Sequence, residues 1–411
     1  MNFIDLYDNE KRSKCPKLIR DADNKIWNYD FKQRMYIEIK EEDVKCLHSV
    51  VQFNFKHENA LKNKFDVIKY NNIIKNDICR DTLKLKDWNF DFVKIEQLIK
   101  FMVHNSIKEK IHVDDKNNNN SLLLQTIDEA SGGGVLIAEK GTHEGKYSLY
   151  DINNSYNKFF LTYSIPSNPQ FCTVNKISLS KTFRIYRLFI EEQYRTQEYK
   201  NKFKSSRKWF TTFDIEIFNM RNIPYKLVQQ ENNCITFDRV NTDFDWMETL
   251  NELKQNTDKE TQPMKKNILK LLLSSVWGEI CKYETQPEFT EDEEIPPQYK
   301  NPVRGEIDNK FYYNIHRDTG ERNYINPNKI YKYATGIIKP FVLAFARLQL
   351  WTQINKLESK GCKVIFAHTD SIITDGKEKY FDIGSEIGQY KHEQTSEKGI
   401  IIKNIASKTF M

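Results

Sequence analysis

The sequence predicts a mixed fold of the α/β (α+β) class, in which helices pack against antiparallel strands, and three observations predict it. Residues 146–151 form an aromatic and apolar segment typical of a strand, and cap residues then lead into a predicted helix ending near residue 160. Residues 362–374 form two β-rich arms around a polar centre, which predicts a hairpin with residues 369–371 at its turn. The largely apolar segment 336–357 is typical of a buried helix.

The composition is that of a globular protein with two or three domains. The chain has 411 residues, of which 39% are hydrophobic and 29% charged, and a domain typically holds about 150 residues. No apolar run reaches the roughly 18 residues that a membrane span needs, so we expect no membrane partner. The net charge of +6 is compatible with a polyanionic partner.

The first residues and the cysteines predict where the protein works. The N-terminus carries neither a basic stretch nor an apolar one, so we expect no secretory signal. The seven cysteines occur singly, without the spacing of zinc ligands, which predicts reduced thiols. We therefore expect a protein of the cytoplasm or of an organelle, not a secreted one.

Three local signals organise the first part of the chain. Apolar residues recur at helical spacing over 92–102, which predicts an amphipathic helix. The polar run 112–121 has little to bury, so we expect a loop. Gly132–Gly134 is the sharpest break in the sequence, and we place the main domain boundary beside it.

The second half contains a further helix and an insertion. A helix is predicted from Pro263, which suits a first helical position, to about Trp277. Lys266 and Lys270 lie one turn apart on it. The acidic, proline-containing stretch that follows, up to about residue 331, indicates a surface excursion with a hairpin.

Two aspartates are candidates for a site that binds divalent metal. Asp151 follows the predicted strand, and Asp370 lies at the turn of the predicted hairpin. Hard carboxylate ligands can hold two cations that stabilise the attacking and leaving oxygens of a displacement at phosphorus, and lysines on a helix face can neutralise a triphosphate. Taken singly, a strand-end aspartate is also a common turn or cap residue, and a lysine on a helix is commonly only solvated.

The ordered set of motifs resembles family B DNA polymerases, especially the protein-primed branch of phages, adenoviruses and linear plasmids. Tyr150–Asn157 resembles motif A, DxxSLYP, and Lys270–Gly278 resembles motif B, Kx3NSxYG. Phe366–Ser371 resembles motif C, YxDTDS, and Lys408–Phe410 is similar to the KxY motif. The four motifs keep the order of the family and cover about residues 131 to 410.

The resemblance implies a right-hand palm with an antiparallel sheet and helical fingers. It implies domains at 131–244 (palm with motif A and a first insertion), 245–282 (fingers), 283–332 (second insertion) and 333–411 (palm with motif C and KxY). Residues 1–130 would form a truncated or degenerate exonuclease-like domain, because 63–66 and 101–105 only partly match its carboxylate motifs. Asp214-Ile-Glu216 mimics such a motif but lies after motif A, so we assign it to the connection from palm to fingers.

The resemblance also implies roles for individual residues. Asp151, Asp370 and the backbone of Ile152 would bind two Mg²⁺ ions, with Mn²⁺ as an alternative. The implied nucleotide-binding residues are Lys270, Lys266, Tyr156, Ser155, Asn154 and Ser274. The implied DNA-binding residues are Lys408, Thr369, Ser371 and Gly278. The implied partners are primer-template DNA, dNTPs and a terminal protein that serves as primer.

Three departures from the family pattern keep other functions open. His368 stands where motif C has its first aspartate, and a neutral imidazole does not replace a carboxylate's charge. Ser274 and Trp277 stand for the Asn and Tyr of motif B. The sequence ends soon after Lys408, so we expect the thumb to be missing or supplied by another chain. The alternatives are an impaired or fragmentary polymerase-like protein that binds DNA or a replication partner and, ranked lowest, an RNA-templated polymerase.

Overall fold

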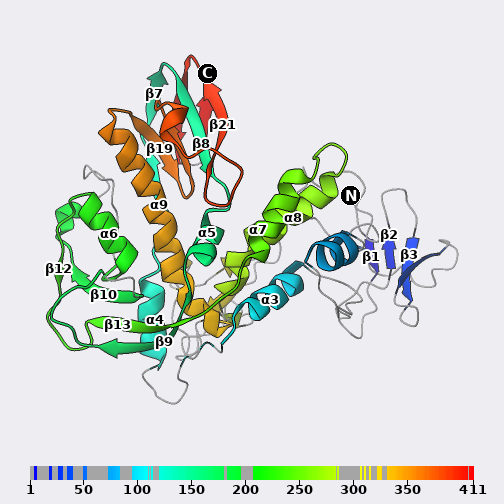
Figure 1. The fold of residues 1–411 in the computed structure, drawn as a ribbon, viewed down its shortest axis with the longest axis horizontal. Helices are drawn as coiled ribbons and strands as arrows, with labels where there is room; N and C mark the ends of the chain where they lie inside the picture. The colour runs from blue at the N-terminus through cyan, green and yellow to red at the C-terminus, as the bar shows by residue number, and fades with distance from the viewer. Residues whose placement is uncertain are drawn as a thin grey trace. The chain divides into compact units, whose positions relative to one another are not determined.

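The structure is a computed structural model, drawn as a ribbon in Figure 1. It describes residues 73–83, 95–109, 111, 113, 120–179, 183–195, 207–283, 331–405 and 407–411, and the backbone of ten short strands outside these ranges. Two compact units divide the chain. Unit 1 comprises Met1–Phe101 and Trp246–Leu273, and unit 2 comprises Met102–Asp245 and Ser274–Met411. The domain ranges expected from the sequence remain predictions.

Unit 1 contains short antiparallel strands and helices. β1 pairs with β5, and β3 lies between β2 and β4. These strands cover Ile4–Leu6 (β1), Leu18–Arg20 (β2), Ile26–Asp30 (β3), Met35–Ile39 (β4) and Val50–Gln52 (β5). The helices are the π-helix η2 (Ile73–Thr82), α7 (Trp246–Asn256) and the first part of α8 (Pro263–Ile280). An ion pair of 3.1 Å between Lys265 and Asp77 joins α8 to η2 within this unit.

Two of the predicted helices agree well with the structure. α3 covers Ile95–Ser106, and Leu98, Ile99 and Met102 of its predicted apolar face are buried. α8 begins at Pro263, as expected of a proline, which lacks the amide hydrogen that a first helical turn leaves unused. Residues 63–66 and 291–294, which also figured in the sequence analysis, lie outside the described residues.

A five-stranded antiparallel sheet, called here the central sheet, forms the middle of unit 2. Its strand order is β21-β8-β20-β19-β6. The strands are β6 (Leu136–Ala138), β8 (Tyr147–Ile152), β19 (Val364–His368), β20 (Ser371–Thr374) and β21 (Tyr390–Ser396). β8 is the predicted strand that carries Asp151, and β19 and β20 form the predicted hairpin.

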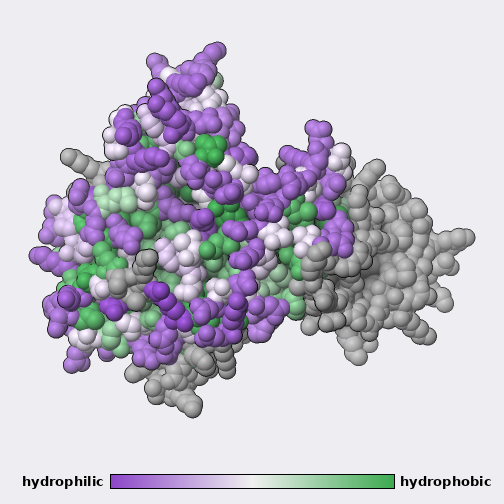
Figure 2. Space-filling model, in the orientation of Figure 1, coloured by the Kyte–Doolittle hydropathy of each residue, from purple (hydrophilic) through white to green (hydrophobic). Residues whose placement is uncertain are grey.

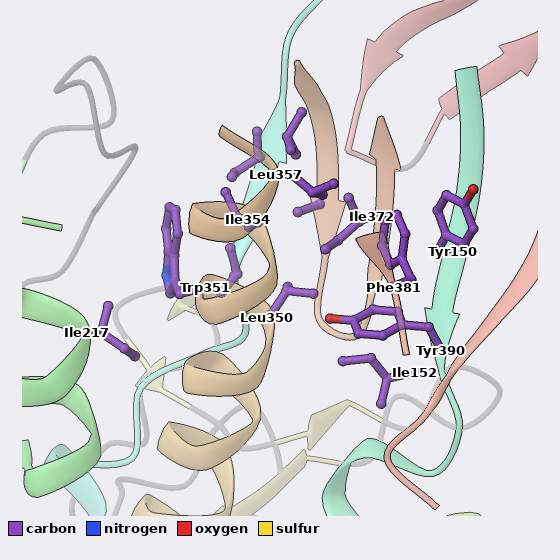
Figure 3. Packing of buried hydrophobic residues seen from close by; sticks show 14 residues of the cluster. Tyr150, Ile152, Ile217, Leu350, Trp351, Ile354, Leu357, Ile372, Phe381 and Tyr390 are labelled. Atoms are coloured by element: carbon purple, nitrogen blue, oxygen red, sulfur yellow. The ribbon is translucent and has the colours of Figure 1, made fainter. Parts of the chain in front are cut away.

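The long helix α9 (Lys339–Ser359) covers one face of the central sheet. The short 3-10 helix η4 (Ala334–Ile338) precedes it, and the predicted buried segment 336–357 falls on these two elements. Leu350, Ile354 and Leu357 pack against Ile152 and Ile372 of the sheet (Figure 3). Burial of this apolar surface holds helix and sheet together, at about 25 cal/mol for each Å² removed from water.

Three further groups of elements complete unit 2. The first-insertion sheet has the order β11-β10-β13-β9, with β12 paired to β10, and the C-terminal sheet has the order β23-β22-β7. Their strands are β7 (Gly141–Glu144), β9 (Ile165–Cys172), β10 (Arg184–Phe189), β11 (Trp209–Thr211), β12 (Lys226–Leu227), β13 (Cys234–Val240), β22 (Gly399–Asn404) and β23 (Ser407–Phe410). The helices are α4 (Asn120–Glu129), α5 (Ser155–Thr162), α6 (Thr212–Met220), η3 (Glu192–Tyr194) and η5 (Glu378–Tyr380).

The start of α4 corrects one prediction. The expected loop 112–121 extends too far, because Asn120 and Ser121 already belong to the helix. Both residue types are favoured at helix starts, where their side chains can bind free backbone amides. Polar composition alone therefore did not separate a loop from the first residues of a helix.

Short antiparallel pairs lie in the second insertion, where a hairpin was predicted. β18 lies between β14 and β17, and β15 pairs with β16. These strands are β14 (Thr285–Gln286), β15 (Glu306–Ile307), β16 (Lys310–Phe311), β17 (Asn314–Ile315) and β18 (Arg322–Ile325). The ends of the insertion meet at a bridge between Tyr283 and Tyr331, whose rings stack with centroids 5.7 Å apart.

The visible surface of the described residues is mostly hydrophilic. Figure 2 shows hydrophilic residues over much of the face in view, with apolar residues in patches between them. Among the described helices, none combines the length and the apolar character that crossing a membrane requires.

Candidate active site

Asp151 lies on the middle strands of the central sheet and is half-buried. Side chains alternate between the two faces of a strand, so Tyr150 and Ile152 of β8 point into the core under α9 while Asp151 points to the other face. In the neighbouring strands, Ser371 of β20 and Lys391 of β21 pair with Asp151. The strand that was predicted to end on a carboxylate therefore places that carboxylate between two partner strands.

Asp370 lies in the tight turn between β19 and β20. Its amide donates to the carbonyl of His368 at 2.7 Å, and its own carbonyl accepts from the amide of Ile152 at 2.9 Å. Thr369 has a φ of 58°, which is unusual for a β-branched residue. The bond to Ile152 fixes the turn beside β8, so strand pairing brings together two aspartates that lie far apart in sequence.

The charges around the two carboxylates favour a bound cation. Burial, followed by the charges of Asp370 and Glu393, raises the pKa of Asp151 to about 7, although Lys391 and Lys408 lower it. Burial also raises the pKa of Asp370, against the opposing effects of the turn backbone and of His368. A cation would relieve the cost of holding both carboxylates ionised in this partly buried place.

The residues present fit a divalent metal that also takes ligands from a substrate. Mg²⁺ is commonly bound by one or two carboxylates together with phosphate oxygens and water, and Asp151 and Asp370 supply such carboxylates. Within the described ranges, no group of three or more His, Cys, Asp or Glu side chains is arranged to hold a metal ion. The backbone amide of Ile152 is used by the turn, which leaves its carbonyl as the atom of that residue suited to a cation.

Lys408 supplies positive charge on the same side of the sheet. Its Nζ lies 4.1 Å from the ring centroid of Phe366, and β23 carries it into the C-terminal sheet. Burial lowers the pKa of Lys408, while the charge of Asp151 raises it. Lys391, the strand neighbour of Asp151, forms an ion pair of 2.7 Å with Glu393.

His368 ends β19 as an exposed residue, and its backbone organises the turn. Its carbonyl accepts from the amide of Asp370 and, at 3.1 Å, from the hydroxyl of Ser371. The charge of His368 favours the ionised form of Asp370, and lowers the pKa of that carboxyl to that extent. The imidazole thus stands beside the site but brings no carboxylate to it.

The start of α5 places Tyr156 near Asp370. Asn154 holds the N-cap position with φ 48° and ψ 49°, and its carbonyl accepts from the amide of Asn157 at 2.9 Å. The ring of Tyr156 stacks on that of Trp277, with centroids 5.0 Å apart and an angle of 30° between the planes. Burial raises the pKa of Tyr156, and the charge of Asp370 adds to this. An aromatic pair thus borders the carboxylates.

The remaining predicted residues of motifs A and B have different surroundings. The hydroxyl of Ser155 lies 3.5 Å from Oε1 of Gln349, and Ser274 and Gly278 are exposed on the last turns of α8. Lys266 and Lys270 belong to unit 1, where Nζ of Lys266 donates to the carbonyl of Thr257 at 2.8 Å and Lys270 is exposed. Contact of either lysine with a triphosphate stays a prediction.

Several residues near the carboxylates were not named from the sequence. Lys391 and Glu393 became visible only through the pairing of β21 with β8, which the alternation of either strand does not specify. Tyr390 pairs with Ile152 and lies near Leu350 in Figure 3. Its buried hydroxyl has no hydrogen-bond partner among the described residues. Burial, with Asp151 and Asp370, raises its pKa well above the usual value.

Comparison with solved structures identifies the fold. The chain is similar to "Phi29 DNA polymerase complexed with single-stranded DNA", with a TM-score of 0.51 and 17% sequence identity over 80% of this chain and 56% of that chain. It is also similar to "Phi29 DNA polymerase complexed with primer-template DNA and incoming nucleotide substrates", with a TM-score of 0.49 and 15% identity over 93% of this chain and 70% of that chain. For the family B DNA polymerase of the archaeon Pyrobaculum calidifontis, the TM-score is 0.31 and the identity 10%, over 75% and 30% of the two chains.

The first of these likenesses shows that this chain has the fold of family B DNA polymerases. It agrees with the mixed architecture of helices and antiparallel sheets predicted from the sequence. The chain spans about 56% of the length of that polymerase. No protein-family model and no curated protein matches the sequence.

Proposed function

We propose that this protein is a DNA-directed DNA polymerase that performs template-directed nucleotidyl transfer at Asp151 and Asp370. The observation that carries the proposal is the pairing of β8 with the β19–β20 hairpin, which brings two aspartates from distant motifs to one edge of the central sheet. Burial and mutual repulsion raise the pKa of Asp151, and a divalent cation would remove that cost. A polymerase fold with such a pair favours a metal-dependent reaction at phosphorus.

In this proposal the two aspartates hold Mg²⁺ or Mn²⁺, with the carbonyl of Ile152 as a further ligand. The metal ions would lower the pKa of the primer hydroxyl and neutralise charge on the triphosphate. Asp151 and Asp370 bind and orient that charge. Lys408, which already lies within the electrostatic range of Asp151, would approach the primer terminus.

The other predicted residues would select and bind the substrates. Tyr156, supported by its stack on Trp277, would lie under the incoming sugar and exclude a 2′-hydroxyl. Lys270, helped by Lys266, would neutralise the triphosphate, and the backbone of 154–156 with Ser274 would contact its oxygens. Thr369, Ser371 and Gly278 would contact DNA.

The finer assignment to the protein-primed branch is part of the proposal. It rests on the order of the four motifs and on the two insertions, which the sequence resemblance places after motifs A and B. It implies a terminal protein as primer, a role in viral or plasmid DNA replication, and work in the cytoplasm or an organelle.

Extension of a labelled primer on a DNA template tests the proposal. With Mg²⁺ or Mn²⁺ and all four dNTPs, the natural protein should extend the primer, and Asp151→Asn and Asp370→Asn should each lose extension. Asp243→Asn is a matched control, because Asp243 is an exposed aspartate whose ion pair with Lys108 is 3.7 Å long. Extension that survives both active-site substitutions would contradict the assignment.

Sugar selection tests the role of Tyr156 separately. Tyr156→Ala removes the ring that stacks on Trp277 and should increase incorporation of ribonucleotides relative to deoxyribonucleotides. Tyr156→Phe keeps the ring and is the matched control. Unchanged discrimination in Tyr156→Ala would show that another residue selects the sugar.

A second candidate function is a polymerase-like protein that binds DNA without turnover. His368, exposed at the end of β19 and without a carboxylate, is the observation that favours it. His368→Asp separates the two candidates. Extension by the natural protein supports the polymerase, whereas extension gained only in His368→Asp would mean a palm disabled at one residue. Silence in both proteins, with retained DNA binding, would support the binding function.

A further inference from the structure

Two arginines hold the glycine run that precedes β6. Nη1 of Arg347, a buried residue of α9, donates to the carbonyl of Ser131 at 3.0 Å and to that of Gly133 at 2.8 Å. Arg207 donates to the carbonyl of Ala130 at 2.7 Å. Its guanidinium lies where a Cβ at Gly132 would stand, at 2.6 Å. Carbonyls of a glycine-rich segment would otherwise have many conformations available, so these bonds define its path.

A buried aspartate holds both arginines in place. Oδ1 of Asp214 accepts from Nη2 of Arg347 at 2.8 Å and forms an ion pair of 3.3 Å with Arg207. Asp214 is fixed at the start of α6, where Thr211 and Asp214 bind each other's backbone amides. In Figures 1 and 3, α9 lies between α6 and the central sheet, so Arg347 connects the two sides of the helix. The Asp214-Ile-Glu216 segment, which only mimics an exonuclease motif, thereby gains a structural role.

The glycine run contacts the turn that carries Asp370. A Cβ at Gly134 would stand 3.1 Å from Oγ1 and 3.2 Å from Cα of Thr369, and the amide of Thr369 donates to the carbonyl of Val135 at 3.0 Å. Thr369 keeps a φ of 58°, a conformation that persists for a β-branched residue only where its surroundings impose it. The run is therefore one of the surfaces that impose this turn.

We propose that Arg347 and Gly134 are positioning residues, which hold the Thr369–Asp370 turn so that the carboxylate of Asp370 meets that of Asp151. The inference rests on the proposed function for its catalytic consequence, but the mechanical link from α9 to the turn does not. The link runs from Arg347 through the carbonyls of Ser131 and Gly133 to Gly134, and from there to the turn. Neither residue needs to touch substrate.

Matched alanine substitutions in the glycine run test the link. Gly134→Ala places a methyl group against Thr369, whereas a Cβ at Gly133 meets no heavy atom within 4 Å. We expect Gly134→Ala to speed hydrogen exchange of the 364–374 segment, which contains the Thr369 amide, and Gly133→Ala to leave it unchanged. Arg347→Lys keeps the charge but loses the two-pronged geometry of the guanidinium, and should also speed this exchange. Equal effects of the two alanines would overturn the proposal.

A double-substitution cycle separates positioning from general loss of stability. Thr369→Gly removes the side chain that Gly134→Ala would meet and relaxes the left-handed backbone. Gly134→Ala should therefore change exchange at the turn much less in the Thr369→Gly background than in the natural one. The same effect in both backgrounds would refute the contact as the cause.

Kinetics of dNTP incorporation test the catalytic consequence. Gly134→Ala should lower kcat by roughly 10-fold to 100-fold, the cost of misplacing a reacting group by about 1 Å, with little change in KM for the dNTP. Gly133→Ala should stay within about twofold of the natural protein. If the natural protein incorporates no dNTP, the proposed function fails while the exchange experiment still decides the link. Incorporation with an unchanged kcat in Gly134→Ala would overturn the positioning role.

Discussion

Replacing Asp214 by asparagine should destabilise unit 2 by about 3 kcal/mol at pH 7. Burial raises the pKa of Asp214, but Arg207 and Arg347 lower it by more, so it falls from its usual 3.8 to about 2. Each pKa unit corresponds to about 1.4 kcal/mol, so ionised Asp214 contributes roughly 2.5 kcal/mol. Asparagine also leaves two largely buried guanidinium groups without a counter-charge, and breaking a buried ion pair typically costs about 3–5 kcal/mol.

The sign of the pH dependence follows from the lowered pKa of Asp214. The stabilisation is complete above the unfolded pKa of about 4 and is lost as the pH falls from about 4 to about 2, where the folded carboxylate takes up a proton. The difference between the natural protein and Asp214→Asn should therefore narrow in that window.

Urea unfolding followed by tryptophan fluorescence measures this destabilisation. Trp209 and Trp351 are buried in unit 2 and report on its unfolding. Asp243→Asn is the control, since an exposed ion pair contributes about 1 kcal/mol or less. A loss below 1 kcal/mol for Asp214→Asn, or one no larger than that of the control, would refute the account of the Asp214 network.

Two further predictions concern other aspartates. Asp128→Asn should destabilise the base of the second insertion by about 2 kcal/mol, because Oδ1 of Asp128 accepts from the hydroxyls of Tyr283 and Tyr331 and from Nζ of Lys339; limited proteolysis within 284–330 should become faster, and an unchanged rate would count against this clamp. Without metal, Asp151→Asn should raise the melting temperature more at pH 8 than at pH 5. The raised pKa of Asp151, about 7, means that stability is lost as the pH rises from about 4 through 7. Melting curves at the two pH values, with no difference between them, would contradict that pKa.

Local sequence patterns predicted the elements that carry the candidate site. The strand expected at 146–151 is β8, Tyr147–Ile152, and the hairpin expected at 362–374 is β19–β20. Alternation, cap residues and turn chemistry are properties of neighbouring residues, so one sequence contains them. The polar stretch before α4 failed for the same reason, because asparagine and serine suit both a loop and a helix start.

The contacts that complete the site depend on distant residues and were not predictable from local patterns. Arg347 lies in a largely apolar helix, and its carboxylate partner Asp214 is 133 positions away in the chain. Lys391 faces Asp151 only because β21 pairs with β8 in one register. Register and long-range ion pairs are decided by the folded core, which single-sequence periodicity does not specify.

Templated addition of one nucleotide tests the central claim most directly. A primer with a single defined template base would be incubated with Mn²⁺ and each dNTP in turn, using the natural protein, Asp370→Asn and His368→Asp. The account predicts that only the complementary dNTP is added, that its identity changes with the template base, and that Asp370→Asn adds none. Addition that ignores the template, addition that survives in Asp370→Asn, or no addition by either the natural protein or His368→Asp would contradict it.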